Sequence, residues 1–189
     1  MNPTAFNQTA FAEFFEHCVG NWSSERTYHY LTQQQVERSH TDFQIQRLTP
    51  TAKTQVLGDN QYAIPAVLDP LQGFSLGFQT VSETGERVEQ QLNILFIVNQ
   101  EAGAILAGDY LRDRAYEEDR PIISPFRFDA TSRELLMTTT YTHVISVDSI
   151  TLINPQLRIR RIYNYRKPEP GQPLTEMRLV GFGVEQKIP

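Results

Sequence analysis

The 189-residue sequence is poor in cysteine, has no excess of positive charge and lacks any long hydrophobic run. Its one cysteine, Cys18, cannot form a disulfide within the chain, which fits a reducing compartment. The net charge of −5 argues against a nucleic-acid binder, because phosphate contacts need concentrated Lys and Arg, and against attraction to anionic lipid. No stretch offers the roughly 18 apolar residues that a membrane helix needs.

The N-terminal residues include acidic side chains and no basic segment, which is not the pattern of a signal peptide. We therefore expect a cytoplasmic protein without membrane or nucleic-acid partners. Hydrophobic residues make up 40% of the chain and charged residues 21%, which is typical of a globular protein. Because no linker, repeat or low-complexity tract divides the chain, we expect one domain over 1–189.

Residues 4–18 have the periodicity of an α-helix, with four phenylalanines at helical spacing. Gly20 follows just past the end, where a left-handed conformation often terminates a helix. We expect this helix to pack over the open end of a sheet or barrel. Cys18 lies at the C-terminal end, where the helix dipole disfavours a thiolate, so it is interpreted as a buried core residue and not as a nucleophile.

After Gly20, short segments rich in Val, Ile, Thr, Tyr and Phe alternate with turn residues. Without helices between them such strands pair antiparallel, and closure removes their exposed edges. The sequence therefore predicts an all-β fold, an antiparallel up-and-down β-barrel with one N-terminal α-helix. At roughly eight to ten strands it can hold one small ligand. The expected strands are 22–32, 37–48, 53–58, 73–81, 88–98, 103–112, 121–128, 134–142, 145–153, 157–166 and 174–186.

Two expected strands combine cations with aromatic side chains. In a strand every second residue shares a face, so Trp22 shares a face with Arg26, and Arg158 lies beside Arg160 on one face. The usual arrangement of 157–166 would turn its aliphatic face inward and leave the arginines solvated. The alternative is a cationic cavity, in which two guanidiniums suit a ligand with two carboxylates because each can bind one carboxylate bidentately. The pattern leaves both arrangements open.

Two other kinds of site find little support. The histidines lack the spacing of zinc ligands, so no metal site is expected: His17, His29, His40 and His143. The stretch GFSLG at 73–77 matches the serine-hydrolase motif with Ser75 as nucleophile, but that motif needs a strand, a sharp turn and a helix. Here the residues alternate like one continuous strand. A hydrolase acting through Ser75 is kept as a competing hypothesis.

Several stretches, taken together, resemble a known family. Gly20 and Trp22 resemble the entry motif of the lipocalin superfamily, in which the tryptophan plugs the closed end of the barrel. The order of four stretches is similar to that in the S-type phycobiliprotein lyases, the CpcS/CpeS group, from the helix to about residue 166. These stretches are GNWSSERTYHYL (20–31), LRDRAYEEDRPI (111–122), LLMTTTY (135–141) and NPQLRIR (154–160).

The resemblance implies a fatty-acid-binding-protein-like barrel of the calycin superfamily, in a photosynthetic host. It implies a lyase that binds a free open-chain tetrapyrrole, a bilin such as phycocyanobilin. The enzyme attaches the bilin by a thioether, a carbon–sulfur bond, to a cysteine of a phycobiliprotein subunit. The bilin is the substrate, and no cofactor is expected. Many relatives form dimers, so a homodimer is kept as an expectation. The alternative is a non-catalytic bilin or fatty-acid carrier of lipocalin type.

The resemblance also implies roles for single residues. Arg158 and Arg160 are assigned to the two bilin propionates. Asp148 stands where the family usually has a glutamate and is the first candidate for an acid that contacts and protonates the pyrroles; Glu185 is the second catalytic candidate. The other bilin-binding candidates are Trp22, Arg26, Phe78 and Tyr141.

The charged stretch 111–121 is interpreted either as a solvated strand end and turn or as a docking rim for the acceptor subunit. A rim of this kind would set the orientation and rate of encounter more than the affinity.

Overall fold

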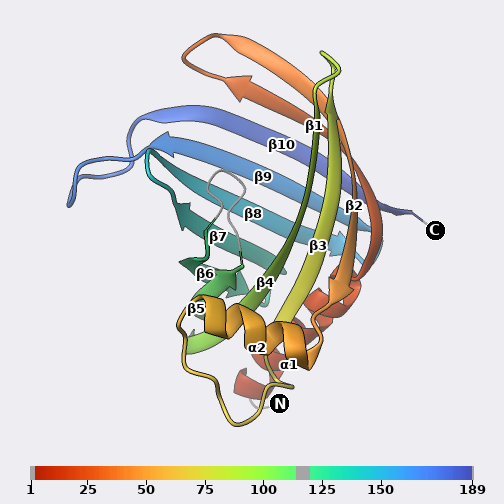
Figure 1. The fold of residues 1–189 in the computed structure, drawn as a ribbon, viewed down its shortest axis with the longest axis vertical. Helices are drawn as coiled ribbons and strands as arrows, with labels where there is room; N and C mark the ends of the chain where they lie inside the picture. Colours follow the sequence, from red (N-terminus) through yellow and green to blue (C-terminus); the bar gives the residue numbers. More distant parts are fainter. Residues whose placement is uncertain (1–2, 114–119, 189) are drawn as a thin grey trace.

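A computed structural model describes residues 3–113 and 120–188, with side chains from Phe6 onward. Within these residues, ten antiparallel strands close into an up-and-down barrel and two helices lie at one end of it (Figure 1). Each strand pairs with its neighbours in sequence, and β1 pairs with β10. The elements are α1 (Pro3–Cys18), β1 (Gly20–Tyr30), β2 (Gln35–Arg47), α2 (Pro50–Asp59), β3 (Gln72–Ser82), β4 (Arg87–Ala102), β5 (Ile105–Arg112), β6 (Ile122–Asp129), β7 (Glu134–Thr140), β8 (Val144–Asn154), β9 (Leu157–Arg166) and β10 (Met177–Ile188).

The predicted all-β barrel with an N-terminal helix is confirmed, and ten of the expected strands are present within a few residues of their predicted ends. No helix in the described part of the chain is long and apolar enough to cross a membrane.

The expected strand over 53–58 is wrong, because these residues belong to α2. Thr49 caps the helix by accepting a backbone N–H of the first turn, and Pro50 occupies the first turn. Both are helix-start signals that the sequence prediction did not use. Val56 and Leu57 are fully buried in a small core on the outside of the barrel. The helix therefore covers the outer wall and leaves the lumen untouched.

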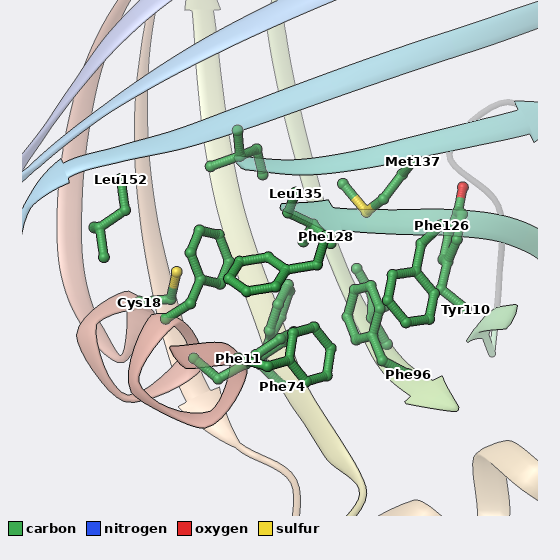
Figure 2. Close-up of a cluster of buried hydrophobic side chains, with 14 of the residues drawn as sticks. Phe11, Cys18, Phe74, Phe96, Tyr110, Phe126, Phe128, Leu135, Met137 and Leu152 are labelled. Atoms are coloured by element: carbon green, nitrogen blue, oxygen red, sulfur yellow. The ribbon is translucent and has the colours of Figure 1, made fainter. Parts of the chain in front are cut away.

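The α1 helix closes one end of the barrel with aromatic side chains, as expected (Figure 2). The ring centroids of Phe15 and Phe96 are 4.9 Å apart, and those of Phe14 and Phe128 are 5.3 Å apart. Phe11 stacks on Phe126 at 5.7 Å. Burying each of these side chains contributes about 1.5–3 kcal/mol, so the apolar face that defines the helix also fixes it to the strands.

Trp22 joins the helix to the first strand and is fully buried. Its indole N–H donates to the backbone carbonyl of Cys18 at 2.9 Å, which satisfies one of the free carbonyls at the helix end. Gly20 between them has φ +131°, a conformation that glycine tolerates best. Cys18 is itself buried, and burial raises the pKa of its thiol above the ordinary value. Its interpretation as a core residue is confirmed.

A stability test follows from Gly108 in β5, which faces an irregularity in β4 between Val98 and Gln100. A Cβ at this glycine would lie 1.9 Å from the carbonyl oxygen of Ile97, which is backbone and cannot move aside cheaply. We expect Gly108→Ala to lower the free energy of unfolding by about 1–3 kcal/mol or more, measured by denaturant titration. Gly77→Ala is the control, since nothing lies within 4 Å of its added Cβ. Equal midpoints for the two variants would contradict the packing described.

Candidate functional site

The barrel encloses a cavity of about 520 Å³ between the helix-capped end and the hairpins at the other end. This volume suits a small organic ligand. One wall is apolar and comes from β2, β3 and β4, with Phe43, Ile45, Phe74, Leu76, Phe78, Leu92 and Ile94. The opposite wall comes from β1, β5 and β7 to β10 and from the turn after β7. It includes the apolar residues Met137, Ile150, Ile162 and Leu179 and a group of polar ones, namely Arg26, Tyr28, Arg112, Tyr141, Ser146, Asp148, Arg158, Arg160 and Asn164.

Arg158 and Glu185 form a buried ion pair at the floor of this cavity. They are direct cross-strand partners on β9 and β10, with exposed side-chain fractions of 3% and 1%. The Arg158 Nε and Nη2 donate to Glu185 Oε2 at 3.0 and 2.7 Å. The same guanidinium lies over the ring of Trp22, 4.3 Å from its centroid. Arg26 approaches the other oxygen, Oε1, at 3.4 Å. The floor therefore holds one carboxylate between two guanidiniums.

The arginines decide the charge of Glu185. Burial alone would raise the pKa of this carboxyl, but Arg158, Arg26 and Arg160 outweigh burial and hold the pKa below its ordinary value. Glu185 is therefore ionised at neutral pH. A buried carboxylate of this kind has no proton to give, so its role in the site is to hold the arginines in place.

Arg160 and Asp148 form a second pair, higher in the cavity. Arg160 Nε and Nη2 donate to Asp148 Oδ1 at 3.1 and 2.6 Å. The side chains are 24% and 15% exposed, so both can reach a molecule in the lumen. The Ser146 hydroxyl donates to the other oxygen of Asp148 at 3.4 Å. Of the two candidate acids, Asp148 is accessible and Glu185 is not.

The arginine face of β9 points inward, so the usual strand pattern does not hold here. Arg158 and Arg160 both line the cavity, while the intervening Ile159 points to the outer surface. Such an arrangement requires carboxylates within reach, because a buried cation without a partner is costly. Glu185 on β10 and Asp148 on β8 supply them.

Two inward glycines on β10 shape the polar wall. A Cβ at Gly181 would lie 2.9 Å from the ring of Tyr28, and one at Gly183 would lie 3.1 Å from Cγ of Arg26. Because these positions have no side chains, the side chains of Tyr28 and Arg26 on β1 can lie across the neighbouring strand β10. Close packing against β1 therefore explains why glycine occupies both positions, 181 and 183.

Arg112 is a lining residue that the sequence reading did not identify. Its Nη2 donates to the hydroxyl of Tyr141 at 2.7 Å, and its guanidinium lies 5.9 and 5.8 Å from the ring centroids of Tyr110 and Tyr141. The stretch 111–121 was expected to be a solvated strand end and turn or a docking rim, and this is wrong for Arg112, which lines the cavity. Residues 114–119 of that stretch lie outside the described part of the chain. The alternation of Tyr110 and Arg112 after a buried Leu106 could have indicated an inward face.

The predicted site residues lie together. Phe78, Tyr141 and Arg26 line the cavity, whereas Trp22 lies beneath it under Arg158. Their roles in binding a bilin stay predictions. Ser75 lies in the middle of β3, paired with Gln46 and Asn93, without the sharp turn and helix that a hydrolase nucleophile needs. The hydrolase hypothesis is therefore wrong.

The comparisons with known proteins agree with this architecture. Residues 10–188 match the family described as CpeS-like protein. The chain belongs to the CpeS-like family. It is 58% identical over 178 residues to Chromophore lyase CpcS/CpeS 1 of Synechococcus sp. (strain JA-3-3Ab), covering 94% of this chain and 96% of that protein.

More distant members of the CpeS-like family are also similar. The Phycocyanobilin lyase subunit CpcS of Picosynechococcus is 23% identical over 148 residues, covering 78% of this chain and 74% of that protein. The solved structure of the S-type phycobiliprotein lyase CPES from Guillardia theta has a TM-score of 0.74 at 15% identity, covering 100% of this chain and 98% of that chain. This last likeness concerns the fold.

Removing the carboxylate from the floor tests the buried pair. We expect Glu185→Gln to lower the free energy of unfolding by about 3–5 kcal/mol, because Arg158 would remain buried without its counter-charge. Denaturant titration measures the effect. Glu176→Gln removes a carboxylate from the surface pairs with Arg178 and Arg166 and should leave the midpoint nearly unchanged. A similar small effect at both positions would argue against an isolated buried pair.

Stability should also depend on pH through Glu185. Its pKa is lower in the folded protein than the ordinary value of 4.5, so below that value the unfolded chain binds the proton first. The stabilisation is complete above about pH 4.5 and is lost as the pH falls through the folded-state pKa. Denaturation midpoints measured from pH 7 to pH 3 should fall less steeply in Glu185→Gln than in the wild type. Parallel curves would contradict the assignment.

Proposed function

We propose that this protein is a chromophore lyase that binds a bilin in the barrel cavity and attaches it to a cysteine of a phycobiliprotein subunit. The observation that carries the proposal is a cavity with one apolar wall and an opposing cluster of guanidiniums. The relatives named chromophore lyase support it, at up to 58% identity over nearly the whole chain.

The charge balance of the cavity favours a ligand with two carboxylates. Below the mouth, the described lining and floor hold four guanidiniums and two carboxylates, namely Arg26, Arg112, Arg158 and Arg160 with Asp148 and Glu185. Glu37 and Glu86 lie at the open rim, on hairpin ends. The excess of two positive charges matches the two propionates of a bilin, and Phe43 and Phe78 suit its conjugated faces. A fatty acid would bring only one carboxylate.

Asp148 is the carboxylate that faces the pyrroles in the proposed reaction. When the bilin lies against it, its carboxyl contacts the pyrrole N–H groups and stabilises the protonated chromophore. Protonation withdraws electrons from the ethylidene group of ring A. The acceptor thiol then adds across that double bond: sulfur bonds to the outer carbon and the proton ends on the adjacent ring carbon. The addition is redox-neutral, so it requires no cofactor.

The nucleophile belongs to the acceptor subunit. Cys18, the last residue of α1, is buried and its thiol pKa is raised by burial, so it is unsuited to attack a ligand in the cavity. The chain's contribution is to position the bilin, stabilise its protonated form and exclude side reactions. The homodimer and the cytoplasmic location stay predictions; light scattering of the purified protein tests the first.

Co-production with a bilin source and an acceptor subunit tests the function. We expect bilin fluorescence on the acceptor that survives denaturation, because a thioether is covalent. Asp148→Asn should slow this transfer by about 100-fold or more while phycocyanobilin still binds, as judged by absorbance. Ser75→Ala, on the outer face of β3, is the matched control and should transfer normally.

The outcomes separate the competing functions. Bound colour without covalent transfer in the wild type would favour the carrier. Transfer that is unaffected in Asp148→Asn would keep the lyase and remove Asp148 as its acid.

A further inference from the structure

The four guanidiniums of the cavity differ in how fully the protein itself engages them. Arg158 and Arg160 each direct Nε and Nη2 at one internal carboxylate. Arg26 has a single long contact to Glu185. Arg112 has no carboxylate within ion-pair distance among the described residues, and its one side-chain hydrogen bond goes to the neutral phenol of Tyr141. It is the cavity cation whose charge the described chain leaves unpaired.

The Arg112 side chain is held in a fixed orientation. Its guanidinium lies over both Tyr110 and Tyr141, and Tyr110 is fixed in turn by a hydrogen bond to the Thr139 hydroxyl. Its Nε is buried and has no hydrogen-bond partner in the described part of the chain. A rigid guanidinium with a free N–H loses little conformational entropy when an anion binds, which favours affinity.

Binding at Arg112 also leaves the internal pairs intact. A ligand carboxylate that took the donor pair of Arg158 or Arg160 would displace Glu185 or Asp148 and leave that carboxylate unpaired, at a large cost. A carboxylate at Arg112 displaces none. Asp148 stays on Arg160 and remains accessible as the proposed acid.

We propose that Arg112 is the docking residue for one carboxylate of the ligand. This inference rests on the proposed function and names a specificity-determining contact within it. Arg112 thereby selects carboxylate-bearing pigments and fixes the register of the bilin along the barrel, with Arg158 and Arg160 acting mainly as partners of the internal acids.

An absorbance titration tests the assignment with two probes, phycocyanobilin and its propionate dimethyl ester. We expect Arg112→Gln to weaken the binding of phycocyanobilin by about 10- to 100-fold, the value of one charge-assisted hydrogen-bonded contact. Binding of the diester should be nearly unchanged. Arg112→Lys, which keeps the charge without the planar group, should recover part of the loss. Arg161→Gln is the matched control, because Arg161 pairs with Glu134 on the outer surface and should affect neither probe.

The results separate this inference from the proposed function. An equal loss for both probes would make Arg112 a structural residue, and an unchanged preference for the free acid in both Arg112 variants would overturn its docking role. In either case, wild-type binding and covalent transfer would leave the lyase function standing. If the wild type bound neither probe, both proposals would fail. Thermal denaturation of each variant checks folding, and the lysine variant carries the test if the glutamine variant does not fold.

Discussion

The charged interior of this barrel depends on the pairing of Arg158 with Glu185 across β9 and β10. Because the two residues are directly opposite each other, each compensates the charge of the other where water is excluded. The ring of Trp22 covers the guanidinium from below. A shift of one residue in either strand would turn its cation or anion to the outside and leave a lone charge within. The pair thus fixes the register at the floor and allows a row of arginines to face a cavity.

The two ends of the barrel have different physical tasks. At one end, α1 fills the opening with phenylalanine rings and seals the core with direct apolar packing (Figure 2). Toward the other end, ion-paired and polar side chains line the cavity together with apolar ones. The chain combines a stable plug with a cavity of about 520 Å³ without needing a second domain.

The cavity has one apolar wall and one wall that carries charged residues, an arrangement that suits the kind of ligand proposed above. Apolar residues of β2 to β4 face Asp148 of β8 and the arginines of β9, so a ligand with a flat conjugated body and acidic side chains can contact both walls. The two acids are not equivalent. Glu185 is enclosed by arginines, whereas Asp148 remains open to the lumen, so only Asp148 can contact a molecule bound in the cavity.

The sequence by itself determined the helix of residues 4–18, the succession of strands and their closure, because hydrophobic periodicity and turn residues are local signals. It did not identify α2, although Thr49 and Pro50 are local helix-start signals, and it left undecided whether Arg158 and Arg160 face the cavity or the solvent. Only the tertiary structure settled that facing, since it depends on carboxylates that β8 and β10 bring alongside β9. The same holds for Arg112: Tyr110 lies on its own strand, but Tyr141 and Asp148 come from the turn after β7 and from β8, and only closure of the barrel places them around one cavity.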